Sequence, residues 1–234
     1  MDDIWKRKHA EAFLAGGPRC RLLITTRDRG IAYEIGAEEQ SVPFMTSAEA
    51  LQLLEEWTTG ALSNTDSGTK EKIVNRLGRL PLAVKLAGAQ LKRQKPDEWL
   101  KTFDVLKLKS NRPEDVHDSL GLTFEHSLKM LENTKRRLYA ALSIFKEDEE
   151  APEVAIERLW GALGKINREE TTELINDLES RALLEVTQRA EPRTIRLHDL
   201  LCDLMHTELG ETGSYEAHQL LITAYRHYFV KKRM

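Results

Sequence analysis

The chain has 234 residues, 41% of them hydrophobic and 31% charged, which is enough to bury one large core or two to three small ones. Its 35 basic and 38 acidic residues give a net charge of −3, which argues against a general nucleic-acid binder. The two distant cysteines argue against a disulfide framework, and the sequence shows neither a signal peptide nor an apolar run of about 20 residues, so we expect a cytoplasmic protein without a membrane partner.

The first 35 residues mix helical and strand patterns. An amphipathic stretch at residues 6–14 predicts a helix, which Gly16-Gly17-Pro18 would end. The apolar, β-branched run at residues 20–26 predicts a buried strand. A short strand needs neighbours in a sheet, and too little sequence precedes this one to supply them. We therefore expect the rest of the sheet to lie upstream of Met1.

From Thr46 onward the pattern is helical. Thr46 and Glu49 have the spacing of a capping box, which predicts a helix start. Residues 64–68 form a predicted polar loop, Gly78 ends a helix, and Pro81 stands where the next helix would place its first residue. Apolar residues spaced by three and four predict helices over residues 46–57, 70–77, 81–91, 97–106 and 115–131.

The last third combines helices with two alternating segments. Asn167 and Glu170 form a second capping-box candidate. Alternating apolar and polar residues predict strands at 184–187 and 193–197, joined by a polar turn. Helix, strand, turn, strand is the outline of a winged helix. Helical periodicity indicates further helices over residues 134–145, 153–163 and 167–183. A last amphipathic helix is predicted through Leu220, Leu221 and Tyr225 to a basic end at residues 231–233.

Four short motifs stand in a fixed order: Asp-Asp-Ile-Trp at residues 2–5, Leu-Leu-Ile-Thr-Thr-Arg at 22–27, Gly-Arg-Leu-Pro-Leu-Ala at 78–83 and Leu-His-Asp at 197–199. They resemble the Walker B, sensor, Gly-Leu-Pro-Leu and Met-His-Asp motifs of the NB-ARC family of signal-transduction P-loop ATPases, found in plant disease-resistance receptors and animal apoptosis adaptors. The pattern G-x-x-x-x-G-K-[ST] is absent from the sequence. Because Met1 falls directly before the acidic pair, the chain resembles the C-terminal portion of the module, a truncated reading of a longer protein.

The resemblance implies a mainly α fold with a small α/β remnant. Residues 1–40 would be the remnant of a truncated P-loop NTPase core, and 41–110 a four-helix lid bundle. Residues 111–210 would be a winged-helix domain, and 211–234 a helical linker to a following domain. Arg79 and Leu197 depart from the residues that the family prefers, Gly and Met, and both replacements look tolerable.

The resemblance also implies a nucleotide site for ADP or ATP with Mg²⁺. Asp2 would hold Mg²⁺, and Asp3 would be the catalytic carboxylate that polarises the attacking water. Arg27 would contact the γ-phosphate, because a planar cation suits a terminal phosphate. Pro81 would pack on the adenine base, and His198 would contact the β-phosphate of ADP.

Each assignment has an ordinary structural alternative. Both acids could be a solvated chain start, and Arg27 could be a surface residue paired with Asp28 or Glu34. Pro81 also fits an ordinary helix-opening proline, and His198 a helix-capping or core histidine.

A metal site at the Leu-His-Asp motif is disfavoured. His198, Cys202 and His206 are spaced by four residues along one predicted helix, so each step separates them by about 6 Å and they do not all reach one ion. Asp199 is expected to cap this helix and to orient His198.

The resemblance implies an ADP/ATP-binding switch that closes over ADP and regulates oligomerisation with other copies. Because the chain lacks the phosphate loop, we expect it alone to bind ADP weakly and not to hydrolyse ATP. One alternative is a helical scaffold without nucleotide binding. The other is a winged-helix DNA-binding regulator, whose recognition helix would carry Glu173, Asp177 and Glu179 against one arginine, the wrong sign for a phosphate backbone.

Overall fold

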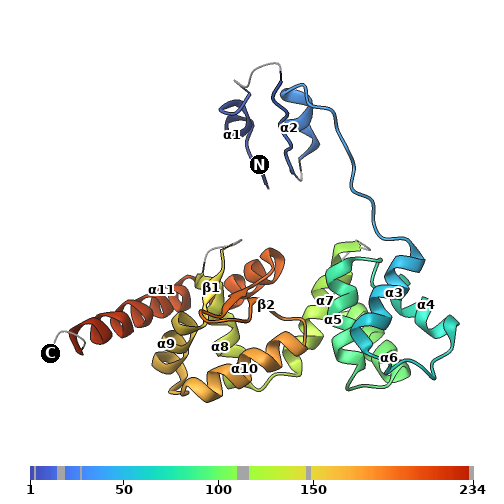
Figure 1. Ribbon diagram of the computed structural model, residues 1–234. Coiled ribbons are helices and arrows are strands. Elements are labelled where there is room, and N and C mark those ends of the chain that lie inside the picture. The colour runs from blue at the N-terminus through green and yellow to red at the C-terminus, as the bar shows by residue number, and fades with distance from the viewer. Residues whose placement is uncertain (3, 15–18, 27, 110–115, 146–148, 232–234) are drawn as a thin grey trace. The chain divides into compact units, whose positions relative to one another are not determined.

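Most of the chain folds as helices, as its richness in Leu, Ala, Glu and Lys predicts (Figure 1). The computed structural model describes residues 1–2, 4–14, 19–26, 28–109, 116–145 and 149–231. Two compact units divide the chain, a small unit at Met1–Phe44 and a large unit at Met45–Met234. Among the described helices, none is both long and apolar enough to cross a lipid bilayer.

The small unit holds two short helices, α1 (Arg7–Glu11) and α2 (Arg29–Glu34), and an extended segment at residues 19–26. This segment lies beside the chain start: the Met1 amino group donates to the Leu23 carbonyl at 2.7 Å. Among the residues of this unit that the structure describes, the buried side chains are Ile4, Ala10 and Ile31. They form a core of a few residues.

The prediction of a buried strand at residues 20–26 is wrong. The segment is extended and pairs with the chain start, since the Ile4 amide donates to the Thr25 carbonyl at 2.9 Å, but it is not a strand. The Leu23 side chain is 83% exposed and Leu22 is 41% exposed. A strand is buried only when packed layers cover its faces, and the described residues of the small unit leave these side chains uncovered.

The first half of the large unit is a set of helices that pack around α5 (Figure 1). The Thr46–Glu49 capping box is present, and Pro81 opens α5, as predicted. One predicted boundary is wrong, because the Asp66 side chain caps α4 and starts it inside the predicted loop. The helices are α3 (Ser47–Thr58), α4 (Ser67–Arg76), α5 (Pro81–Leu91), α6 (Pro96–Lys109) and α7 (Val116–Lys129).

Two features hold α5 tightly in this half. A Cβ at Gly88 would lie 2.7 Å from the Trp57 Cβ, so α5 approaches α3 at a distance that only glycine permits. The buried Gln90 donates to the Thr123 carbonyl at 2.8 Å and accepts from the Trp99 indole at 2.5 Å. The Gln90 side chain thereby links α5 to α6 and α7 with its polar atoms satisfied.

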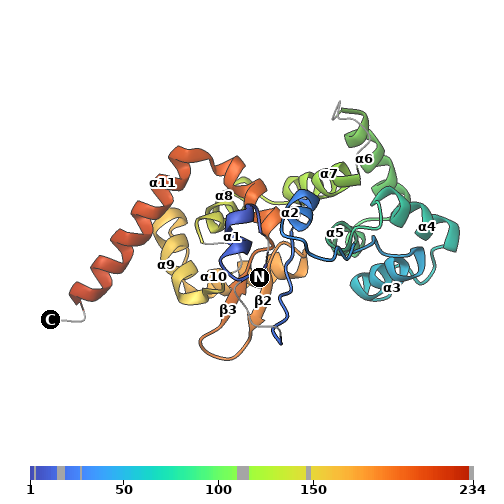
Figure 2. The same cartoon turned by 90° about the horizontal axis from the view of Figure 1, so that it is seen from above.

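The second half of the large unit contains a three-stranded antiparallel sheet of order β1-β3-β2, and Figure 2 shows its β2–β3 hairpin. Ile195 is the central register position, opposite Ala151 and Val186. The sequence predicted β2 and β3 but missed the two-residue β1. The elements are α8 (Asn133–Ala140), the 3-10 turn η1 (Ala141–Ile144), β1 (Ala151–Pro152), α9 (Glu153–Gly164), α10 (Arg168–Ser180), β2 (Glu185–Gln188), β3 (Thr194–Arg196) and α11 (Asp199–Lys231).

The Asn167–Glu170 capping box starts α10, as predicted. Helix α11 bends at Gly210, whose φ of 69° and ψ of 169° fall outside the helical region and favour glycine. Buried aromatics tie the half together: the Tyr139 hydroxyl donates to the Leu183 carbonyl at 2.7 Å, and burial raises the pKa of Tyr139 well above its usual value.

The two halves of the large unit share one continuous apolar core. Arg93, which follows α5, donates to the Ser180 hydroxyl at 2.9 Å and lies 3.7 Å from the Asp177 carboxylate. This contact joins the C-terminal end of α5 to the C-terminal end of α10. The walls of any cavity between α5 and the segment after α10 are therefore held by packing within this unit.

Candidate functional site

A cavity of about 390 Å³ lies between the two halves of the large unit. Its volume is in the range of small-molecule sites. One wall comes from α3 and α5 and is lined by Trp57, Leu82 and Lys85. The opposite wall runs from the end of α10 through β2 and β3 to the start of α11, and its charged and polar lining residues are Glu179, Glu185, Arg196, His198 and Asp199.

The α3–α5 wall pairs an aromatic ring with cations. The half-buried Trp57 has the Lys85 ammonium 5.9 Å and the Lys92 ammonium 5.6 Å from its ring centroid. At these distances the ring quadrupole attracts a cation. Lys85 itself lines the cavity, so this wall presents a flat apolar surface beside a positive charge.

The opposite wall carries exposed ion pairs. The Arg196 guanidinium lies 2.9 Å from the Glu185 carboxylate, and these side chains are 45% and 65% exposed. Glu179 is bound by Arg189 at 2.6 Å. Because exposed pairs of this kind contribute only about 0–1 kcal/mol, their partners exchange readily.

His198 stands at the start of α11 and borders the cavity. Its Nδ1 accepts the Leu200 amide at 3.3 Å, and its carbonyl accepts the Leu201 amide at 2.8 Å. In the neutral ring this arrangement leaves Nε2 as the donor atom. The prediction that Asp199 caps the helix is wrong: Asp199 is the first helical residue, and the capping side chain is His198.

The structure brings two predicted site residues to neighbouring positions. His198 lines the cavity directly. Pro81 is exposed at the first position of α5 and lies outside the lining, whereas the next residue, Leu82, lines it. The first turn of α5 and the start of α11 therefore border the same cavity.

The other predicted site residues belong to the small unit. Asp2 is exposed, and its carboxylate accepts a hydrogen bond from the Thr25 hydroxyl. Asp3 and Arg27 lie outside the described residues. Asp28, considered as an ion-pair partner for Arg27, caps α2 by accepting the Gly30 amide at 2.8 Å. Among the described residues, no three His, Cys, Asp or Glu side chains gather as a metal site.

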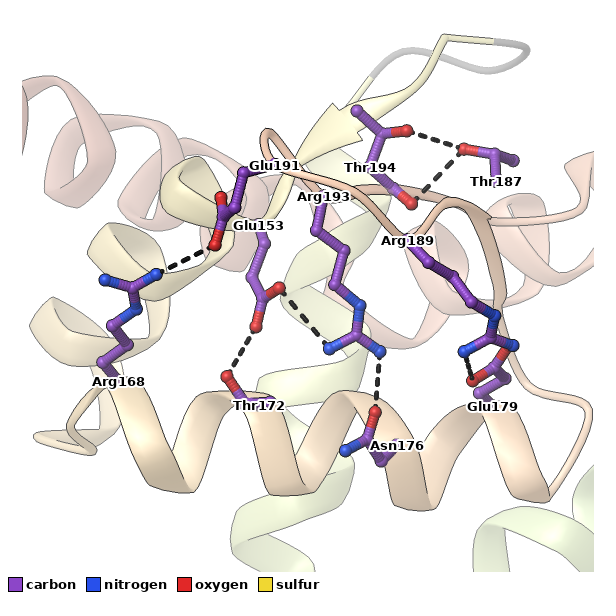
Figure 3. A network of polar contacts seen from close by, with 10 residues as sticks. All are labelled: Glu153, Arg168, Thr172, Asn176, Glu179, Thr187, Arg189, Glu191, Arg193 and Thr194. Carbon is purple, nitrogen blue, oxygen red and sulfur yellow. Dashed lines mark hydrogen bonds and ion pairs between the residues drawn. The ribbon is translucent and has the colours of Figure 1, made fainter.

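A polar network fixes the β2–β3 turn over α10 (Figure 3). Arg193 is its centre, since its guanidinium lies 3.5 Å from Glu153 and donates to Asn176 at 2.6 Å. Thr172 donates to the same Glu153 carboxylate at 2.7 Å. The turn thus contacts α10 directly, and the exposed positions of α10 at 168–170, 173 and 176 are mainly acidic, a poor match to a phosphate backbone.

Sequence reasoning missed Trp57, Lys85, Glu185 and Arg196 as cavity residues. For Lys85 a signal existed, because it follows Pro81 by four residues and so lies on the same face of α5. No comparable signal points to Arg196 or Glu185, which line the cavity because the paired strands β2 and β3 form part of its wall.

The sequence of the chain is similar to proteins of apoptosis and of plant disease resistance. Apoptotic protease-activating factor 1 of Danio rerio is 26% identical over 240 residues, covering 99% of this chain and 18% of its own length, and the Homo sapiens protein is 25% identical over 236 residues. Disease resistance protein RPP13 of Arabidopsis thaliana is 27% identical over 239 residues, covering 93% of this chain and 28% of its own length.

These relatives confirm the resemblance that the four motifs predicted: the chain is homologous to NB-ARC proteins of apoptosis and of plant disease resistance. The chain spans 18% to 28% of the length of these relatives. No family model matches it.

Proposed function

We propose that this chain is the part of an NB-ARC nucleotide switch that closes over ADP. The observation that carries the proposal is the cavity of about 390 Å³ between the first turn of α5 and the start of α11, which bears His198 at its edge. The homology to NB-ARC proteins supports a purine nucleotide as its ligand. The switch, the bound nucleotide and the regulated oligomerisation all belong to this proposal.

In this proposal the adenine base packs against the apolar wall at Pro81 and Leu82, and the phosphates point toward His198. The Nε2 donor of His198 would then hold the β-phosphate and tie the α11 half to the α5 half. ATP would fit this contact less well, so exchange shifts the population toward an open state. The differential affinity for the two states is what makes the module a switch.

The small unit would contribute the remaining groups in the intact protein. Asp2 is an exposed carboxylate, and Mg²⁺ is usually held by one or two carboxylates together with phosphate oxygens and waters, so Asp2 fits this role. Bound Mg²⁺ would neutralise phosphate charge. Asp3 and Arg27 are proposed to orient water and to contact the γ-phosphate, next to a phosphate loop supplied by another part of the protein.

We further propose the family's division of the chain after residue 40. Residues 41–110 would form the lid bundle, 111–210 the winged helix and 211–234 a linker. The sheet order β1-β3-β2, with α8, α9 and α10 around it, supports the winged helix. The acidic face of α10 supports a role in protein contacts rather than DNA binding.

The test is nucleotide occupancy of the full-length protein. His198→Ala and Pro81→Ala should each lower the amount of ADP that copurifies, as measured by chromatography after denaturation. His206→Ala is the matched control, because His206 is an exposed histidine of the same helix outside the cavity. Unchanged occupancy in both site variants would favour the alternative, a scaffold without nucleotide contact.

A further inference from the structure

The cavity has cationic side chains on both walls besides His198. Lys85 comes from α5, and Arg196 comes from β3. The acidic side chains of the lining are Glu179, Glu185 and Asp199. Counting Lys85 and Arg196 against these three gives a formal charge of −1 with neutral His198. A phosphate ligand therefore competes with these carboxylates for the cations of the lining.

Arg196 is the cation best placed to change partner. Its guanidinium lies 2.9 Å from Glu185, and both side chains are substantially exposed, so solvent screens their attraction. A guanidinium binds phosphate through two parallel hydrogen bonds, which are stronger than one contact to an exposed carboxylate. A phosphate dianion in the cavity would consequently outcompete Glu185 for Arg196.

Two further features favour an anion at this point. Lys85 lies on the opposite wall with its ammonium 5.9 Å from the Trp57 ring centroid, and a cation–π contact leaves an ammonium able to donate hydrogen bonds. The N-terminus of α11 also meets the cavity at Asp199 and Leu201, where the positive end of the helix dipole adds to the attraction.

We propose that Lys85 and Arg196 bind a phosphoanhydride from opposite walls of the cavity, and that Glu185 competes with this ligand for Arg196. Glu185 thereby sets the affinity of the site, and the bound phosphates join the α5 half to the β3 half. The identification of the phosphoanhydride as ADP rests on the proposed function. Inorganic pyrophosphate has the same chemistry and serves as the second probe.

The experiment measures the affinity of the complete chain for ADP and for inorganic pyrophosphate by NMR titration, extended to millimolar concentrations. Glu185→Gln should raise the affinity for both probes roughly two- to fivefold, the range set by the strength of an exposed ion pair. Arg196→Gln and Lys85→Gln should each lower it about tenfold. In the Arg196→Gln background, Glu185→Gln should no longer raise the affinity, because the two residues act as a pair.

Glu191→Gln is the matched control. Glu191 forms an exposed pair with Arg168 at 3.1 Å outside the cavity, so this variant changes the net charge equally without touching the site. If Glu185→Gln and Glu191→Gln bind the two probes with equal affinity, Glu185 does not compete with the ligand for Arg196. A gain from Glu185→Gln that persists in the Arg196→Gln background would overturn this competition as well.

The two probes separate this inference from the proposed function. If ADP binds but its affinity is unchanged by Glu185→Gln, Arg196→Gln and Lys85→Gln, the inference fails and the proposed function stands. If the variants change the affinity for pyrophosphate as expected and ADP binds no more tightly than pyrophosphate, the inference stands and the assignment of a nucleotide as the ligand fails. If neither probe binds at millimolar concentration, the inference is overturned. Should Arg196→Gln fail to fold, Glu185→Gln still tests the inference: a higher affinity supports the competition, and an unchanged or lower affinity overturns it.

Discussion

The small unit and the large unit differ in how the residues of the proposed site are placed. In the large unit a continuous core fixes α5, β3 and the start of α11, so the positions of Lys85, Arg196 and His198 follow from packing within the unit. Among the described residues of the small unit, few apolar side chains are buried, and Asp2 lies at an exposed chain start. The comparison teaches that a short sequence motif fixes the positions of its side chains only where a packed core supports the backbone around it.

The strongest test of this difference between the two cores is to truncate one buried side chain in each unit. Trp99 is fully buried, stacks on Phe103 with centroids 5.1 Å apart and donates to Gln90. We expect Trp99→Ala to lower the unfolding free energy of the large unit by about 3–5 kcal/mol. Urea unfolding followed by circular dichroism measures this change.

Ile31→Ala is the partner experiment in the small unit. Ile31 belongs to the small core alone, so this variant should leave the main unfolding transition where it is. A shared loss of stability for Trp99→Ala and Ile31→Ala would show that the two units unfold together, and would contradict the comparison.

A second way to sharpen the comparison concerns polar contacts within the large unit. The Arg193–Glu153 pair has side chains only 12% and 17% exposed, whereas the Arg168–Glu191 pair is 72% and 80% exposed. Arg193→Met leaves a shielded carboxylate with fewer partners, so we expect a loss of about 1–3 kcal/mol. Arg168→Met should cost less than about 0.5 kcal/mol. Equal losses, measured by thermal unfolding, would refute this ranking.

The third prediction is that acid destabilises the large unit through His126. Burial, followed by the nearby Lys129 charge, lowers the pKa of His126 below 6.5 in the folded protein. The unfolded chain therefore binds the proton more readily, and stability is lost as the pH falls below about 6.5, by at most about 1.4 kcal/mol per pH unit.

His126→Leu should flatten this pH dependence in urea unfolding between about pH 7 and pH 5.5, because the replacement does not titrate. The exposed His206 is the control position, and His206→Leu should keep the slope of the parent protein. If the His126→Leu slope equals the parent slope, another group causes the acid sensitivity.

The smallest expected effect is the loss of one helix cap. The Thr46 hydroxyl accepts the Glu49 amide and starts α3, which forms part of the cavity wall. Thr46→Ala should destabilise the large unit by about 1 kcal/mol, and Thr46→Ser, which keeps the hydroxyl, should restore most of it. A full loss in the serine variant would mean that the methyl group, rather than the cap, matters.

Much of the fold could be predicted from local signals. The capping boxes at Thr46 and Asn167, the proline start of α5 and the alternation of β2 and β3 all appear in the structure. The strand at residues 20–26 was predicted wrongly, because its apolar run indicates burial while the described small unit supplies no cover for Leu23. The strand β1 escaped prediction because two residues are too short to show a period.

The sequence by itself determined where α3, α5 and α10 begin, since caps and periodicity depend on residues within four positions of one another. Tertiary structure alone decided that Trp57 and Arg196 line one cavity with His198. These residues meet through contacts between segments far apart in the chain, such as the Arg93–Ser180 hydrogen bond across 87 positions. No local pattern encodes such a meeting, because it depends on how the shared core packs.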